Sequence, residues 1–216
     1  YKSEIPSSQF LLSTKKHVGF QRNLGAKYSQ AVLLIFFDAD VNIGTTFLEE
    51  VHVAVVKQKI KFATTWVLGD SKEPLDEMMV LMSNLIFELA NSLKKPFIWG
   101  FNIIVERKLF FTLHGFREDT KMGEDHDFVM RARGLDIELV LLREPLLTMS
   151  LRRFRAQGVL PVLRQSRGAD AHPQGLPVPE LPFRHRPEPG SAAPLGLRWP
   201  LLPRLPVPLL LASQFF

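Results

Sequence analysis

The chain has 216 residues, of which 46% are hydrophobic and 23% are charged, enough for one core of ordinary size. It contains no cysteine, which excludes disulfides, zinc–thiolate sites, iron–sulfur clusters and a cysteine nucleophile, and which is compatible with the cytosol. The chain begins at Tyr1 rather than at a methionine, and no signal peptide follows. We therefore expect it to be a piece of a longer protein, truncated at its N-terminus.

The composition changes near residue 160. Residues 161–216 hold 12 of the 16 prolines and six arginines but no lysine, and they contribute +3 of the net charge of +5. The basic excess therefore does not indicate a nucleic-acid-binding face on residues 1–160. We expect a folded domain over 1–160 and a proline/arginine-rich tail over 161–216 that is disordered or not native to the protein. A ligand for a proline-recognising domain is an alternative for the tail.

Hydrophobic patterning predicts strands that alternate with helices. A short helix over 20–30 precedes a strand over 31–37, where seven consecutive apolar residues indicate burial on both faces. The further expected elements are a helix over 45–58, a strand over 61–68, helices over 75–94 and 107–114 with a strand over 99–105 between them, a helix opening at Gly123 and a strand over 137–142. This order predicts an α/β sandwich with a mainly parallel sheet.

The expected helix over 75–94 is long and rich in methionine and leucine. Polar residues interrupt it, including Asp76, Glu77 and Glu88, and a membrane-spanning helix tolerates such residues poorly. Packing in a core and lying on a membrane surface both remain open for this helix.

The first acidic cluster, Asp38-Ala39-Asp40, directly follows the buried strand. Ligands of open α/β sheets bind at the carboxyl ends of the strands. Two carboxylates one residue apart can bind one hard cation such as Mg²⁺ or Mn²⁺, together with substrate phosphates. An aspartate-containing turn without a ligand is the alternative.

The second cluster is Glu124-Asp125-His126-Asp127, at the start of an expected helix. Acids interact well with the positive end of the helix dipole, but three of them exceed what capping needs. A carboxyl group near other carboxylates has a raised proton affinity, which suits a general base. His126 is a further candidate metal ligand, and a plain surface residue is its alternative.

Five segments in order resemble the family 2 glycosyltransferase pattern, over roughly residues 17–155. They are Gln21-Arg22-Asn23-Leu24-Gly25-Ala26, Asp38-Ala39-Asp40, Trp99-Gly100-Phe101-Asn102, Gly115-Phe116-Arg117-Glu118, and Gly123-Glu124-Asp125-His126-Asp127 with Arg131. The resemblance implies the GT-A fold, which is Rossmann-like, and transfer of a sugar from a nucleotide diphosphosugar to an acceptor hydroxyl with inversion. It implies that the enzyme is a metal-dependent hexosyl- or glycosyltransferase.

The resemblance also assigns roles to residues. It implies that Asp40 binds Mg²⁺ or Mn²⁺, that Asp38 assists the metal or contacts the ribose, and that Arg22 and Asn23 lie at the nucleotide. Asp125 would be the general base and Glu124 its support. We further expect a saccharide or lipid acceptor and a role in cell-envelope polysaccharide. We expect no nucleic-acid partner. The expected location is cytoplasmic, with peripheral contact with the inner face of the membrane.

The family's first strand, a Pro-x-Tyr-Asn-Glu type segment and a second strand have no counterpart here. We therefore expect a fold that is incomplete at the N-terminus, and a non-catalytic remnant of such an enzyme is the main alternative. A nucleotidyltransferase would need an early glycine-rich, basic phosphate loop, and the sequence contains none.

Overall fold

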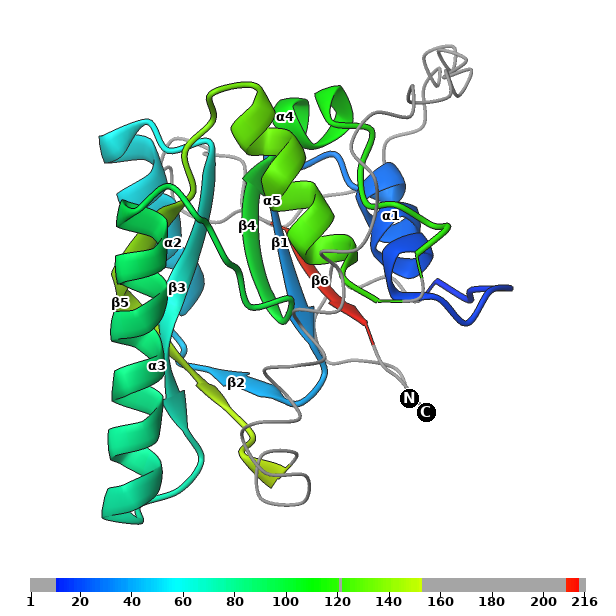
Figure 1. Cartoon of the computed structure of the whole chain (residues 1–216). Coiled ribbons are helices and arrows are strands. Elements are labelled where there is room, and N and C mark those ends of the chain that lie inside the picture. The colour runs from blue at the N-terminus through cyan, green and yellow to red at the C-terminus, as the bar shows by residue number, and fades with distance from the viewer. Residues whose placement is uncertain (1–10, 121, 153–208, 214–216) are drawn as a thin grey trace, which may run out of the picture.

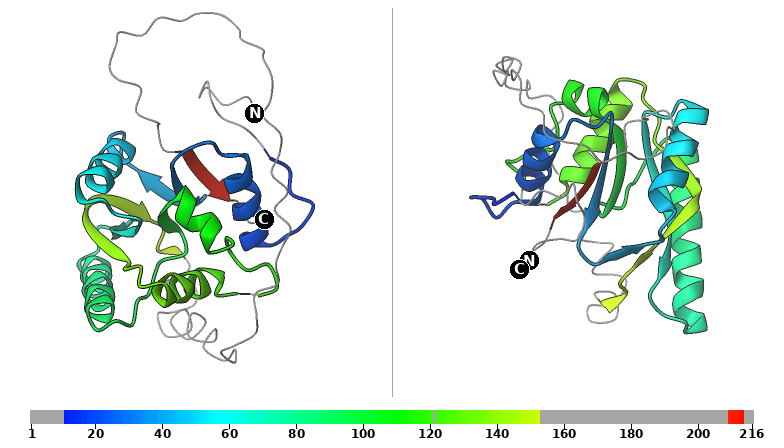
Figure 2. Two further views of the ribbon diagram at one scale, coloured as in Figure 1. Left: turned by 90° about the horizontal axis from the view of Figure 1, so that it is seen from above. Right: turned by 180° about the vertical axis from the view of Figure 1, so that it is seen from behind.

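The computed structural model describes residues 11–120, 122–152 and 209–213, the last group through its backbone. Helices lie on both faces of one sheet (Figures 1 and 2). The helices are α1 (Val18–Tyr28), α2 (Phe47–Gln58), α3 (Pro74–Ser92), α4 (Arg107–Thr112) and α5 (Glu124–Gly134). The strands are β1 (Leu33–Asp38), β2 (Val41–Ile43), β3 (Phe62–Gly69), β4 (Asn102–Glu106), β5 (Val140–Met149) and β6 (Leu209–Ser213). The α/β class is confirmed, and every expected helix and strand has a counterpart.

The sheet has the strand order β2-β5-β3-β4-β1-β6, and it is mixed rather than mainly parallel. β4 is antiparallel to both β1 and β3, and β2 is antiparallel to β5, whereas β3–β5 and β1–β6 are parallel. The reason lies in residues 93–101. After α3 this segment returns the chain to the edge of the sheet where α3 began, so β4 enters in the reverse direction.

β1 is buried on both faces, as its unbroken apolar sequence predicts. Leu34 and Phe36 belong to one cluster, together with side chains of α1, α4 and α5. Ile35 and Phe37 belong to a second cluster with side chains of α2 and α3. Alternate residues of a strand point to opposite faces, so β1 connects the two halves of the core.

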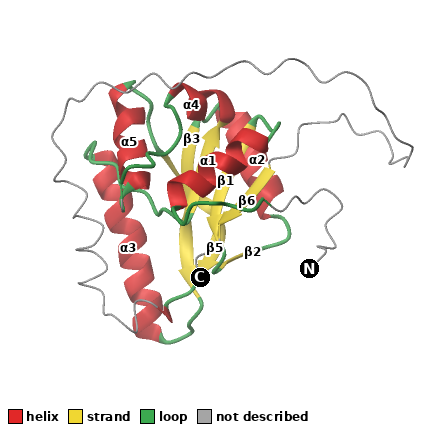
Figure 3. Cartoon of the chain, turned by 90° about the vertical axis from the view of Figure 1, so that its right-hand side faces the viewer, coloured by secondary structure: helices red, strands yellow, loops and turns green. Residues whose placement is uncertain are grey.

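Four strands run in one direction, so the carboxyl ends of β1, β3, β5 and β6 lie at one edge of the sheet. The amino end of β4 lies at the same edge because β4 is reversed. The turn after β1, the loop before β4 and the N-terminus of α5 therefore come together (Figure 3). This edge holds the acidic residues that the sequence singled out.

β6 lies within the expected tail and pairs in parallel with β1, with Leu34 opposite Leu209. The rest of the 161–216 segment lies outside the described residues, and its expected disorder stays a prediction. The boundary near 160 and the missing N-terminal strands also stay predictions. No helix in the described ranges is long and apolar enough to cross a membrane.

Candidate active site

The guanidinium of Arg22 joins four separate parts of the chain. Its Nη2 donates to Asp38 Oδ1 at 2.9 Å and to the carbonyl oxygen of Gly100 at 2.7 Å. Its Nη1 donates to Glu124 Oε1 at 3.1 Å. The residue is only 4% exposed, and its guanidinium carbon lies 5.5 Å from the ring centre of Phe116. One cation from α1 thus holds the end of β1, the loop before β4 and the start of α5.

Asn23, the next residue of α1, binds the loop after α4. Its Oδ1 accepts from the backbone N–H of Phe116 at 2.8 Å. Its Nδ2 donates to the Phe116 carbonyl oxygen at 2.8 Å and to Glu118 Oε1 at 2.9 Å. Gly115 has φ +68°, and a Cβ there would lie 2.5 Å from Asn23 Oδ1, so only glycine fits. Arg22 and Asn23 therefore position the site, and their contact with a nucleotide stays a prediction.

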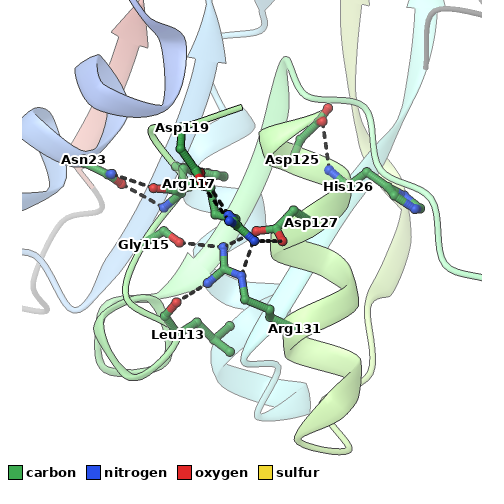
Figure 4. A network of polar contacts seen from close by, with 10 residues as sticks. Asn23, Leu113, Gly115, Arg117, Asp119, Asp125, His126, Asp127 and Arg131 are labelled. Atoms are coloured by element: carbon green, nitrogen blue, oxygen red, sulfur yellow. Dashed lines mark hydrogen bonds and ion pairs between the residues drawn. The ribbon is translucent and has the colours of Figure 1, made fainter. Parts of the chain in front are cut away.

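The first turn of α5 is also held by Arg131, which lies one turn after Asp127 (Figure 4). Its Nη2 lies 2.7 Å from Asp127 Oδ2, and its guanidinium also donates to the carbonyl oxygens of Leu113 and Gly115. Because Asp127 is paired with Arg131, it stabilises the loop of Leu113 and Gly115 against α5. Glu124 and Asp125 are the acids of α5 that lie toward the Arg22 network.

Asp125 is packed against the loop before β4. Its Oδ1 accepts from the backbone N–H of His126 at 2.8 Å. A Cβ added to Gly100 would lie 2.4 Å from Asp125 Oδ2, so the carboxyl group rests directly on the glycine backbone. Sequence reasoning found the Trp-Gly-Phe-Asn segment but not this contact. The sequence feature that could have indicated this contact is a glycine between two aromatic residues, Trp99 and Phe101.

Burial raises the pKa of both acids at the start of α5. Desolvation is the main cause for Asp125, and the His126 hydrogen bond and the charge of Arg22 oppose it in part. For Glu124, desolvation comes first and the neighbouring Asp125 adds to it, while Arg22 acts in the opposite direction. A carboxylate whose pKa is raised is a stronger base for proton transfer.

Asp38 and Asp40 lie on either side of the turn between β1 and β2. Asp38 is the last residue of β1, its side chain is 22% exposed, and one of its oxygens binds Arg22. Asp40 is exposed and precedes β2. Both offer the hard oxygen ligands that Mg²⁺ or Mn²⁺ prefers. Within the described residues, no group of three His, Cys, Asp or Glu side chains could hold a metal ion.

The ring of His126 lies beside a group of aromatic side chains. Its ring centre lies 6.4 Å from that of Phe97, which stacks on Phe87 at 4.8 Å. Trp99 meets Phe87 edge to face at 4.4 Å. A metal-binding role for His126 stays a prediction. The aromatic group beside Asp125 was not singled out from the sequence, although Phe97, Trp99 and Phe101 alternate there.

Replacing Arg22 tests whether its network holds the site together. Arg22→Met leaves the carboxylates of Asp38 and Glu124 without their cation, which we expect to destabilise the fold by about 3–5 kcal/mol. Arg22→Lys keeps the charge but cannot reach three acceptors in the same geometry, so it should rescue only part of the loss. Urea unfolding measures both variants. The exposed pair Arg143–Glu88 provides the control, since Arg143→Met should change little. Equal effects of Arg22→Met and Arg143→Met would contradict the assigned role.

The raised pKa of Asp125 predicts a pH dependence of stability. Between its ordinary pKa of 3.8 and the higher value in the fold, the folded state binds more protons than the unfolded state. The contribution of this group to stability is therefore lost as the pH rises through that window. The Asp125→Asn variant has no carboxyl group at this position, so it does not lose this contribution to stability as the pH rises. The melting temperature of the variant relative to the unsubstituted chain should increase as the pH rises above the ordinary pKa of 3.8. A difference that stays constant with pH would show that Asp125 titrates normally.

Comparisons with known proteins give similarities to solved structures only. No protein-family model and no curated protein matches the chain. Among solved structures, the mannosyltransferase PcManGT from Pyrobaculum calidifontis, in complex with GDP-Man and Mn²⁺, has 16% sequence identity and a TM-score of 0.48. The similarity covers 76% of this chain and 46% of that protein, so this chain spans less than half of its length. A similarity of this size does not assign a function.

Proposed function

We propose that residues 1–160 are part of the catalytic domain of an inverting, metal-dependent glycosyltransferase that uses a nucleotide diphosphosugar. The observation that carries this proposal is the Arg22 network. It brings the turn of Asp38 and Asp40 and the acids of α5 to the same edge of the sheet. Donor phosphates and acceptor hydroxyl would then meet at one place, as a single displacement needs. The resemblance to family 2 glycosyltransferases supports the same reaction.

Asp38 and Asp40 form the donor side of the proposed site. Their carboxylates would hold Mg²⁺ or Mn²⁺ together with oxygens of the donor diphosphate. The bound cation would supply charge stabilisation for the departing diphosphate. Because one oxygen of Asp38 is bound to Arg22, Asp38 keeps a fixed orientation, and the exposed Asp40 is the more accessible ligand.

Asp125 forms the acceptor side. Its carboxylate removes the proton from the acceptor hydroxyl as that oxygen bonds to the anomeric carbon. The bond from this carbon to the diphosphate oxygen breaks, and the diphosphate leaves with the electron pair. Burial raises the pKa of Asp125, which makes it a stronger base, and Glu124 holds the adjacent position through Arg22. The acceptor, a saccharide or a lipid, and a cytoplasmic location at the membrane face belong to the same proposal.

Removing one carboxylate tests the donor side. We expect UDP or GDP to bind more tightly with Mn²⁺ than without it, and Asp40→Asn to abolish the metal-dependent part. Titration calorimetry measures both. Asp136→Asn is a matched control, because Asp136 is also exposed but follows the far end of α5. Metal-dependent binding that survives in Asp40→Asn would remove Asp40 from the metal site. No nucleotide binding by the folded chain would favour the non-catalytic remnant.

Asp125→Asn tests the acceptor side. The amide keeps the shape of the side chain and can still accept from the His126 N–H, but it cannot take a proton. Sugar transfer, or hydrolysis of a nucleotide-sugar, should fall by about 10²–10⁴-fold with little change in nucleotide affinity. Product chromatography gives the rate and calorimetry gives the affinity. An unchanged rate would exclude Asp125 as the base.

A further inference from the structure

α3 presents its large apolar side chains to solvent. The outer face of α3 consists of seven residues of the helix and the C-cap residue Leu93, each between 41% and 64% exposed: Leu75, Met78, Leu81, Met82, Leu85, Ile86, Leu89 and Leu93. Figure 1 shows α3 at the outer side of the molecule, with the sheet on its other side. Single exposed apolar residues are common, but a continuous apolar face of this kind marks an interaction surface.

The spacing of these residues gathers them into one stripe. They recur at intervals of three and four, which places them on one side of a helix. The side that faces the sheet carries Val80, Asn84 and Phe87. Asn84 exchanges hydrogen bonds with the backbone N–H and carbonyl of Val67, at 3.2 and 2.9 Å. The amide thus points inward while methionine and leucine point outward, the reverse of an ordinary surface helix.

The size of the outer face matches that of a protein–protein interface. A helix of 19 residues is about 28 Å long. Eight half-exposed large side chains offer on the order of 700 Å², close to the ~800 Å² that each partner contributes to a standard interface. Burying such an area against a second protein surface can support a stable complex.

The charges at the two ends of α3 point to a second copy of the chain in antiparallel orientation. Asp76 and Glu77 lie in the first turn, after Glu73, and outnumber Lys72 there. The exposed Lys94 and Lys95 follow the last turn. Two antiparallel copies of α3 would bring the acidic beginning of one helix to the basic end of the other. A two-fold axis produces this arrangement at both ends and closes the assembly as a dimer.

An anionic bilayer fits the outer face less well. Interfacial helices draw on lysines and arginines along their polar side. Between Pro74 and Ser92, α3 has neither residue type, and its charged side chains are Asp76, Glu77 and Glu88. Glu88 is paired with Arg143 at 2.7 Å, so that arginine is already engaged within the chain.

We propose that the chain forms a homodimer through the outer face of α3, with the two α3 helices antiparallel across the two-fold axis. The inference concerns assembly and does not depend on the glycosyltransferase proposal. Met82, Leu85 and Ile86 lie near the middle of the stripe, next to the axis. Residues of the candidate active site, such as Asp125 and Gly100, are not part of this face.

Analytical ultracentrifugation of the full chain tests the dimer. We expect a dimer for the unsubstituted chain and a monomer for Met82→Glu/Ile86→Glu, because four carboxylates would meet near the axis. The dissociation constant should rise more than about tenfold. Both positions are exposed, and circular dichroism should show an unchanged fold. Leu135→Glu, at an exposed apolar residue after α5, should leave the dimer intact. A monomeric unsubstituted chain, or a dimer indifferent to the double substitution, would overturn the proposal.

Reversing charge at the ends tests the antiparallel orientation. Glu77→Lys alone and Lys94→Glu/Lys95→Glu alone should each weaken the dimer, and all three changes together should restore much of it. If the triple variant dimerises as weakly as the sum of the separate effects predicts, the antiparallel orientation is wrong. Sedimentation with vesicles of phosphatidylcholine and phosphatidylglycerol tests the competing occupant. Vesicle binding by a monomeric chain, lost in Met82→Glu/Ile86→Glu, would assign the face to a membrane instead.

Discussion

A single buried cation determines how the candidate active site is assembled. Arg22 is almost fully removed from solvent, and it makes hydrogen bonds to two carboxylates and one carbonyl oxygen from three different segments. A buried guanidinium without such partners would cost several kcal/mol, so the surrounding segments are constrained to stay where they satisfy it. The positions of the β1–β2 turn, the loop before β4 and the start of α5 are therefore coupled.

The acids at this edge of the sheet have two kinds of environment. Asp38 is bound directly to Arg22 at 2.9 Å, and Asp40 is exposed beside it in the turn. Asp125 rests against the backbone of Gly100, and desolvation raises its pKa. Neighbouring carboxyl groups with different environments can take different tasks, one set holding a cation and another transferring a proton. Two environments of this kind at one sheet edge are what the proposed transfer reaction needs.

Sequence patterns were sufficient for the helices and strands, because these depend on local residue types. The apolar run before Asp38 identified β1, and the acids after Gly123 identified the start of α5. The mixed sheet was missed because the direction of β4 depends on where residues 93–101 take the chain, and hydrophobic periodicity carries no such information. The three-residue strand β2 is too short to show a period. The partners of Arg22 and Asn23 are distant in sequence, so their positioning roles became visible only in the fold.

β2 has a consequence for the order in which the site can be completed. It follows Asp40 directly and pairs with the far end of β5, where Val41 is opposite Met149 and Ile43 is opposite Leu147. During synthesis, Asp40 emerges more than a hundred residues before the strand that fixes the turn beside it. A nascent chain that ended before Leu147 would contain every acid of the candidate site and still lack the partner of β2. The proposed cation-binding turn can therefore take its final form only after the end of β5 has been made.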